Sequence, residues 1–200
     1  MDDDSATEIL EATYRALCRH GYADLTTGDI AAETDRSKAL IHYYYDSKEN
    51  LFAEFLEFLY EKYTDRLASA TGDTPRAELF ALFESLLVDE ETQAGQEFRT
   101  AMLEVTAQAP HNAEIQRELA RFDAALFDRV SDLVAAGVEA GEFDDRIDPE
   151  TAAEFLVTTV TGVHTRSVAA GHSTEQLYEI ITTYVEAHLL ADEPTEAIQS

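Results

Sequence analysis

Cysteine, proline, glycine and tryptophan are scarce in this sequence of 200 residues, which has one, four, eight and none of them. The single cysteine, Cys18, excludes a disulfide within the chain, and its place on an apolar helical face favours a small core residue. Few prolines and glycines leave long stretches uninterrupted, which favours helices. No apolar run approaches the roughly 20 residues of a membrane-spanning helix, so we expect no membrane partner.

Targeting and catalytic signals are also lacking. The chain begins with Met1-Asp2-Asp3-Asp4, whereas a signal peptide has a basic start and an apolar stretch, so we expect a cytoplasmic protein. There is no Ser/His/Asp or Cys/His signature, no glycine-rich phosphate loop and no metal-ligand spacing among the six histidines. We therefore expect neither an enzyme nor a bound cofactor or metal, although catalytic groups far apart in sequence would escape this test.

Basic residues are few. Arginine and lysine total 14 against 41 aspartates and glutamates, a formal net charge of −27. Such a charge normally favours self-repulsion, disorder or avoidance of nucleic acid, but a regular apolar pattern argues against disorder. At about 1 M salt the Debye length is roughly 3 Å, so an acidic surface hardly repels itself. Because only Lys38, Lys48 and Lys62 are lysines, we interpret the chain as halophilic; an acidic mesophilic protein is the alternative.

The apolar spacing predicts an all-α protein of nine helices, without a strand pattern or an internal repeat. Ser5 and Glu8 have the spacing of a capping box, and Asp148-Pro149 predicts a start with proline in the first helical position. The predicted helices begin at or near Ser5, Thr26, Ser37, Ser47, Pro75, Glu90, His111, Asp148 and Ser173. Those with a marked end finish near Gly21, Tyr43, Ala70, Ala109, Ala140, Gly171 and Ala191.

Thr71-Gly72-Asp73-Thr74-Pro75 is the first clear break in this pattern, and we place a domain boundary there. Residues 1–50 are expected to form one domain, and the helix at 47–70 connects it to a second domain, residues 71–192. Residues 193–200 are expected to be a flexible tail.

Residues 26–45 have the pattern of a helix-turn-helix, in which two short helices pack closely across a tight turn. Ala31 is small enough for close helix approach, and Asp35 tolerates the left-handed backbone of a turn. Ile30, Ile41 and Tyr44 are spaced to close a small core. The residues left to face outward or toward a DNA groove are Ser37, Lys38, Ala39, Leu40, His42 and Tyr43. This pattern alone would also fit many other short helix pairs.

Residues 9–52, about a quarter of the chain, contain four diagnostic elements: Gly21-Tyr22, Thr26-Thr27, Asp29-Ile30-Ala31 and, most specifically, IHYYYDSKE at residues 41–49. By these elements the segment resembles the N-terminal domain of the Tet repressor family. The remainder is similar to the family by its helical architecture rather than by a motif. The resemblance implies an N-terminal helix-turn-helix domain and a C-terminal helical domain for effector binding and dimerisation.

For function, the resemblance implies a dimeric, sequence-specific transcription regulator bound to a palindromic operator in double-stranded DNA. The helix at 37–43 would enter the major groove, where Lys38, Ala39 and Leu40 read base edges and thymine methyl groups. The residues that would contact phosphates are Thr27, His42, Tyr43 and Lys48. Repression, with release of the DNA when a small-molecule effector binds, follows the family's tendency.

Simpler roles are open for several of these residues. Tyr44 and Tyr45 fit core packing, His42 fits a solvated surface position, and Thr27 fits a helix cap. The sequence also departs from the family at the turn, where Asp35-Arg36 stands in place of Gly-Val; the guanidinium of Arg36 would reach phosphate or solvent.

The charge of the expected DNA-binding region is mixed. Residues 1–50 hold eleven acidic and five basic residues, whereas the segment from Arg36 to Lys48 holds three basic residues and one acidic residue. The attraction to DNA is therefore predicted to be local and weak, and the contribution of counterion release to be small at molar salt.

The two C-terminal helices, at 148–171 and 173–191, carry more apolar surface than one flank of a small monomer needs. The resemblance implies that they pair with their counterparts in a four-helix homodimer interface. The residues assigned to it are Phe155, Thr159, Gly162, Val163, Leu177, Ile181, Tyr184, Val185 and His188. Packing within the monomer alone is the alternative.

A partly apolar small-molecule pocket in the C-terminal body is also implied by the resemblance. The candidate lining residues are Phe80, Phe83, Phe98, Met102, Phe122, Leu126 and Phe155, with His164 and Arg166 as polar anchors. Their helical spacing is equally typical of ordinary core positions. The alternative function, suggested by the charge of −27, is a helical sensor or interaction protein without DNA binding.

Overall fold

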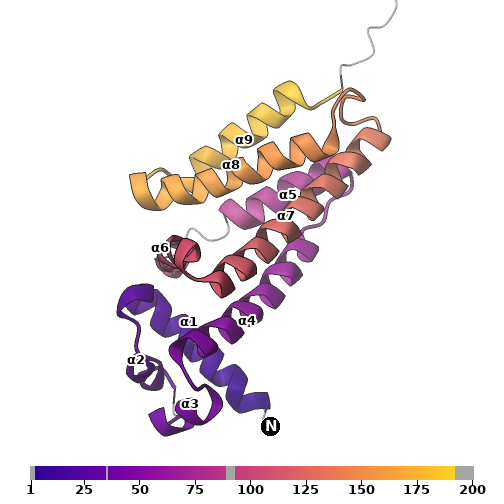
Figure 1. Cartoon of the computed structure of the whole chain (residues 1–200). Helices are drawn as coiled ribbons and strands as arrows, with labels where there is room; N and C mark the ends of the chain where they lie inside the picture. The colour runs from indigo at the N-terminus through magenta and orange to yellow at the C-terminus, as the bar shows by residue number, and fades with distance from the viewer. Residues whose placement is uncertain (1–2, 35, 89–92, 192–200) are drawn as a thin grey trace, which may run out of the picture. The chain divides into compact units, whose positions relative to one another are not determined.

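A computed structural model describes residues 3–34, 36–88 and 93–191. Within these ranges the chain forms nine α-helices, one 3-10 turn and no strand (Figure 1), so the predicted all-α class is confirmed. The elements are α1 (Asp3–Asp24), α2 (Thr27–Ala32), α3 (Lys38–Tyr44), α4 (Lys48–Ser69), α5 (Pro75–Leu87), α6 (Gln93–Gln108), the 3-10 turn η1 (Ala109–His111), α7 (Ala113–Glu139), α8 (Pro149–Ala170) and α9 (Thr174–His188).

The chain divides into two compact units. The first unit consists of residues 1–65 and 90–123, and contains α1, α2, α3, α6, η1, most of α4 and the start of α7. The second unit consists of residues 66–89 and 124–200, and contains α5, α8, α9 and the remainder of α4 and α7. The functional boundary expected at residues 71–75 stays a prediction.

Side-chain caps confirm several of the predicted helix starts. Ser37 Oγ accepts a hydrogen bond from Leu40 N at 3.2 Å, and Ser47 Oγ accepts one from Asn50 N at 3.1 Å. The carboxylate of Asp148 caps α8 in the same way, with Pro149 in the first turn. The first amide groups of a helix have no partner inside it, so these oxygens determine where the elements begin.

The predicted cap at Ser5 is wrong. The first helix begins at Asp3, and Ser5 is buried inside it. The carboxylate of Glu8 accepts hydrogen bonds from Thr34 Oγ1 at 2.7 Å and from Arg36 Nε at 2.8 Å, rather than closing a capping box. Gly21 does interrupt α1, because its φ of 71° and ψ of 170° are not helical, and a last turn then continues to Asp24.

The structure also changes the ends of two later helices. The sixth helix is described from Gln93, and its predicted start at Glu90 lies outside the described residues, as do Asp35 and the tail at 192–200. The ninth helix ends at His188 rather than near residue 191. The backbone there pairs with the α7–α8 connection: Asp144 N donates to Leu189 O at 3.0 Å, and Ala191 N donates to Glu142 O at 3.1 Å.

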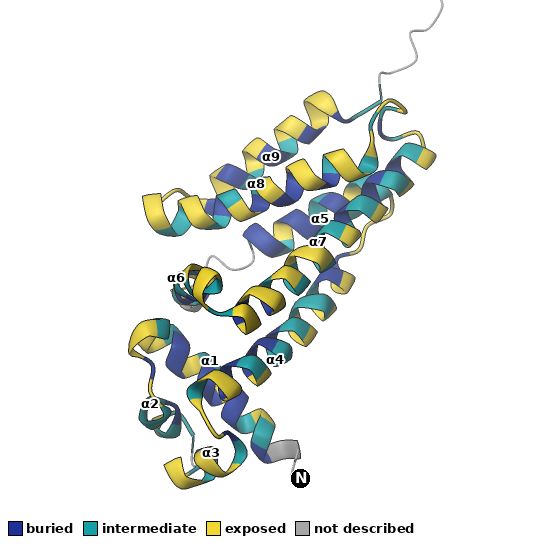
Figure 2. Ribbon diagram, viewed as in Figure 1, coloured by how far each residue is buried: buried dark blue, intermediate teal, exposed yellow. Residues whose placement is uncertain are grey.

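One hydrophobic core fills the first unit. The first helix packs on α6 and α2, and α2 packs on α3. Members of this core that are at most 1% exposed include Ile9, Leu17, Ile30, Ile41, Phe55, Ala101 and Val105. Figure 2 shows the buried residues on the inward faces of α1 and α4. The core therefore positions the short helices α2 and α3, which are too short to be stable alone.

In the second unit, α5 packs against α8 and α9. Leu79, Leu82 and Phe83 of α5 are fully buried. Gly137 of α7 lies directly against the buried ring of Phe143, because a Cβ at this position would stand 2.2 Å from Phe143 Cδ2. Among the described helices, none combines the length and the apolar character that crossing a membrane requires.

Candidate nucleic-acid interface

The start of α2 is fixed by a reciprocal pair of hydrogen bonds. Thr26 Oγ1 accepts from Asp29 N at 3.2 Å, and the carboxylate of Asp29 accepts from Thr26 N at 2.9 Å. Hydrogen bonds from the hydroxyl and amide of Thr26 lower the pKa of Asp29, so this carboxylate is charged at neutral pH. Thr26 is therefore the cap, and Thr27 is the half-buried first residue of the helix.

The third helix buries one face and presents the other to solvent. Ile41 is fully buried and Tyr45, which follows the helix, is 7% exposed, whereas Tyr43 is 81% exposed. Leu40 and Tyr44 are half-buried. The other exposed residues of this surface are Ser37, Lys38, Ala39 and His42, and Figure 2 shows exposed positions along α3. We call Ser37, Lys38, Ala39, Leu40, His42 and Tyr43 the α3 face.

Lys48, in the first turn of α4, contacts the end of α1. Its Nζ donates to the carbonyl oxygen of Tyr22 at 2.9 Å and lies 4.7 Å from the centre of the Tyr22 ring. Burial lowers the pKa of this ammonium. An ammonium has three N–H donors, so a phosphate contact would use those that do not bind Tyr22. The contact with Tyr22 was not predicted from the sequence.

The arginines of the first unit's N-terminal region are held in ion pairs. Arg36 Nε donates to Glu8 at 2.8 Å, a contact that the sequence did not indicate; the phosphate contact of its guanidinium stays a prediction. Arg19 Nη1 lies 2.5 Å from Glu33 Oε1, and Arg15 Nη2 donates to the backbone carbonyl of Glu33 at 2.8 Å. These contacts join α1 to the segment between α2 and α3, where Arg15 and Arg19 share the single carboxylate of Glu33.

Glu104 of α6 binds the sharp corner at the end of α1. Its Oε2 accepts from Tyr22 N at 2.7 Å. Gly21 has a φ of +71°, and a Cβ there would stand 2.6 Å from the same carboxylate oxygen. The peptide groups of Tyr22 are therefore bound from two sides, the N–H by α6 and the carbonyl by α4. The sequence indicated the break at Gly21, but it did not indicate Glu104 as the partner.

A hollow of about 520 Å³ opens between α1 and α6 in the first unit. Its lining is mostly polar and includes Cys18, Gly21, Gln96, Thr100 and Glu104. Burial raises the pKa of the Cys18 thiol. The predicted pocket is lined by other, mostly aromatic residues, so the sequence did not identify this hollow. The polar residues that recur at helical spacing along α6 are the sequence feature that could have indicated it.

The nine candidate pocket residues fall into both units. Phe98, Met102 and Phe122 are partly buried beside the core of the first unit. In the second unit Phe83 and Leu126 are buried, and His164 Nε2 lies 3.2 Å from the carbonyl oxygen of Leu86. Phe80 lies under the guanidinium of Arg76, and Phe155 and Arg166 are exposed. The candidate pocket stays a prediction.

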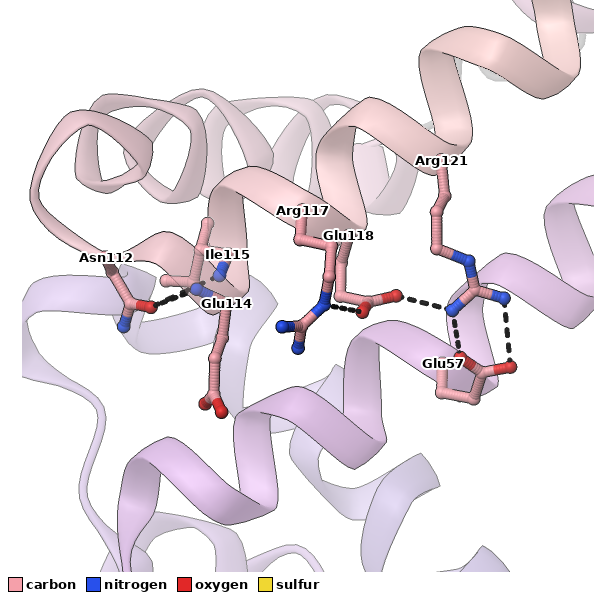
Figure 3. Close-up of polar contacts among 7 residues, drawn as sticks. All are labelled: Glu57, Asn112, Glu114, Ile115, Arg117, Glu118 and Arg121. Carbon is pink, nitrogen blue, oxygen red and sulfur yellow. Dashed lines mark hydrogen bonds and ion pairs between the residues drawn. The ribbon is translucent and has the colours of Figure 1, made fainter.

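Phe122 belongs to a mixed aromatic and charged cluster on α4 and α7 of the first unit. Its ring contacts those of Tyr60 and Tyr63, with ring centres 5.4 Å and 5.2 Å apart. Beside it, Arg121 bridges Glu57 of α4 and the buried Glu118 of α7 (Figure 3). This ion pair lowers the pKa of Glu57. The cluster therefore joins α4 and α7 within the first unit.

The residues assigned to a dimer interface separate by burial. Val163, Leu177, Ile181 and Val185 are buried within the second unit, so they contribute to its core rather than to its surface. Phe155, Tyr184 and His188 are exposed and form a continuous row of rings, with centres 5.0 Å and 4.5 Å apart. Ile180, which we had not assigned, is 57% exposed. A Cβ at Gly162 would meet nothing within 4 Å.

Comparison with known proteins gives matches along both parts of the chain. A family model of bacterial regulatory proteins of the tetR family matches residues 9–55, and a model of the C-terminal region of BetI-type transcriptional repressors matches residues 75–190. The HTH-type transcriptional repressor SCO4008 of Streptomyces coelicolor is 34% identical over 151 residues, which are 72% of this chain and 71% of that protein. The repressor AcnR of Corynebacterium glutamicum is 25% identical over 88% of each chain.

Solved structures of other proteins have the same fold as this chain. A TetR transcription regulator from Haloarcula marismortui superposes with a TM-score of 0.85 at 34% identity, over 93% of this chain and 98% of that one. A regulator from Saccharomonospora viridis, in complex with choline, has the same fold with a TM-score of 0.85 at 22% identity, over 96% of this chain and 100% of that one. Because the C-terminal model covers more than half of the chain and the N-terminal model covers the helix-turn-helix, the chain belongs to the TetR family of transcriptional regulators.

Proposed function

We propose that this protein is a repressor that binds a palindromic operator as a homodimer and releases it when a small-molecule effector binds. The observation that carries the proposal is the α3 face, where polar, basic and aromatic side chains are exposed on a short helix whose opposite side is buried. Such a helix fits the major groove, where Lys38 would reach guanine and Ala39 and Leu40 would contact thymine methyl groups.

The proposed phosphate contacts surround this helix. Tyr43 and His42 are exposed at its end, and Thr27 lies in the first turn of α2. We assign Lys48 and Arg36 a smaller share than their charge suggests, because each already binds an oxygen of the protein. The α3 face would therefore supply specificity, with Lys38 as the main electrostatic contact.

The proposed homodimer would form through α8 and α9. The exposed row of Phe155, Tyr184 and His188, together with Ile180, is apolar surface of the kind that partners bury. Gly162 supports this reading, because the open space over a residue without a side chain lets another helix approach closely. A two-fold dimer would place two copies of α3 one DNA turn apart.

The effector is proposed to be a small, partly apolar molecule. A structure of the same fold is described as a complex with choline and another as a complex with stearoyl-CoA, so the fold accommodates ligands of different sizes. Regulation rather than catalysis is proposed, in line with the relatives named as transcriptional regulators. We also propose a cytoplasmic location, where the DNA target would lie.

The proposal is tested by selecting duplexes from a random library with the purified protein in molar KCl, and by measuring their binding by fluorescence anisotropy. Lys38→Ala and Tyr43→Ala should each weaken the selected complex by about tenfold or more. Lys62→Ala is the matched control, because it removes the same charge from an exposed position on α4. A failure to enrich any sequence would favour a sensor or interaction protein without DNA binding.

A further inference from the structure

The basic side chains near the α3 face are largely occupied by the protein itself. Arg15 and Arg19 bind Glu33, and Arg36 binds Glu8. The ammonium of Lys48 binds the Tyr22 carbonyl. Of the arginines and lysines in the described part of residues 1–50, Lys38 alone has no protein partner.

Several carboxylates lie beside the same surface. Asp46 is exposed just after α3, and Glu49 is exposed in the first turn of α4. Hydrogen bonds from its own backbone amide and from Ser47 lower the pKa of Glu49, and the capping bonds lower the pKa of Asp29. The carboxylates of Glu49 and Asp29 therefore keep their negative charge at neutral pH.

This arrangement bears on how the affinity for DNA depends on salt. A protein that neutralises Z phosphates releases counterions, and its affinity falls with salt with a logarithmic slope of about −0.9Z. Lys38 has no protein partner and Lys48 keeps its charge beside a neutral carbonyl oxygen, so release at these two lysines gives a slope of about −2 for each subunit. Each carboxylate brought near a phosphate acts in the opposite direction, because the two negative charges must retain or gain a cation between them.

We propose that this protein binds DNA with a net uptake of monovalent cations, so that its affinity rises with the KCl concentration. The cations would be shared between DNA phosphates and the carboxylates beside the α3 face, chiefly those of Asp46 and Glu49. Screening acts in the same direction: the Debye length falls from about 10 Å at 0.1 M to about 3 Å at 1 M, which removes the repulsion between DNA and a chain of charge −27. The inference rests on the proposed function, since it concerns the operator complex.

The test is a titration of the selected duplex with KCl, from about 0.3 M to about 3 M, over the range in which the circular dichroism spectrum is constant. The expected affinity increases by up to about tenfold over this range, a logarithmic slope between zero and about +1. A negative slope of any size would overturn the inference, because it would mean that the complex releases more cations than it takes up.

A pair of double variants tests the local part of the proposal. Asp46→Asn/Glu49→Gln should bind more tightly at low salt and should lower the slope, because fewer cations are needed. Glu61→Gln/Asp65→Asn removes the same charge from exposed positions on α4 and should leave the slope nearly unchanged. Equal effects of the two variants would show that total charge governs the salt response, against this proposal. If no specific complex formed at any KCl concentration, the proposed function itself would fail.

Discussion

Replacing Gly21 by alanine should strongly destabilise the first unit. The backbone of Gly21, with φ of 71° and ψ of 170°, lies in a region that is essentially restricted to glycine, and placing another residue there costs about 1–3 kcal/mol. The new Cβ would also stand 2.6 Å from Glu104 Oε2. The carboxylate must then move away and release Tyr22 N, a half-buried hydrogen bond to a charged acceptor that contributes about 1–2 kcal/mol.

The two effects together predict that Gly21→Ala lowers the free energy of unfolding by about 2–5 kcal/mol. For a chain of this size that corresponds to a decrease in Tm of roughly 5–15 °C, measured by circular dichroism in molar KCl. Glu104→Ala alone should cost about 1–2 kcal/mol, since it removes only the hydrogen bond.

The double variant Gly21→Ala/Glu104→Ala separates the causes. Both single changes disrupt the same Glu104–Tyr22 bond, so the double variant should be less destabilised than the sum of the single variants by about 1–2 kcal/mol. Strict additivity would show that the clash with Glu104 has no effect. A Gly21→Ala protein as stable as the unchanged chain, within about 0.5 kcal/mol, would refute the reasoning about both the backbone and the carboxylate.

Three further changes test other contacts. Lys48→Met should lower the free energy of unfolding, measured with denaturant in the absence of DNA, by about 1 kcal/mol, because the Lys48 ammonium binds the Tyr22 carbonyl. A variant that weakens DNA binding but unfolds like the unchanged chain would contradict this structural role. Burial raises the pKa of Tyr45 to about 12. The neutral phenol therefore contributes fully to stability below about pH 10, the pKa of tyrosine in the unfolded chain, and this contribution is lost as the pH rises through 12. An absorbance titration at alkaline pH should show one late phenol that is missing in Tyr45→Phe, and ionisation of all tyrosines together would speak against it. Ile180→Asp should convert the proposed dimer to monomers in sedimentation experiments, whereas Ala124→Asp, at an exposed position on α7, should not.

The sequence by itself determined the helices and most of their starts. The hydrogen bonds that fix a start, such as Ser37 to Leu40 and Ser47 to Asn50, join residues three positions apart, so the local pattern contains the information. The buried faces of the two short helices were also predictable from the local sequence. Ile30 and Ile41 are apolar positions among polar neighbours, and this pattern marks the face of a helix that turns inward.

Only the tertiary structure decided which charged groups the protein uses for itself. The partners of Glu8 are 26 and 28 residues away, and Glu104 binds an amide 82 residues away. A local pattern gave Glu8 a place in a capping box, but a guanidinium and a hydroxyl brought close by folding bind its carboxylate instead. Lys48 and Tyr22, which are 26 residues apart, make a contact that the local pattern did not show for the same reason.

The division of α8 and α9 between core and surface also depended on the fold. Val163, Ile181 and Phe155 are all apolar, and the sequence assigned all three to one interface. Within the second unit, where α5, α8 and α9 pack together, Val163 and Ile181 are buried and Phe155 is exposed. The sequence does not show which neighbour covers an apolar side chain, because the hydrophobic effect is non-directional. The neighbouring helix, supplied only by the folded chain, therefore decides which residues remain for a partner.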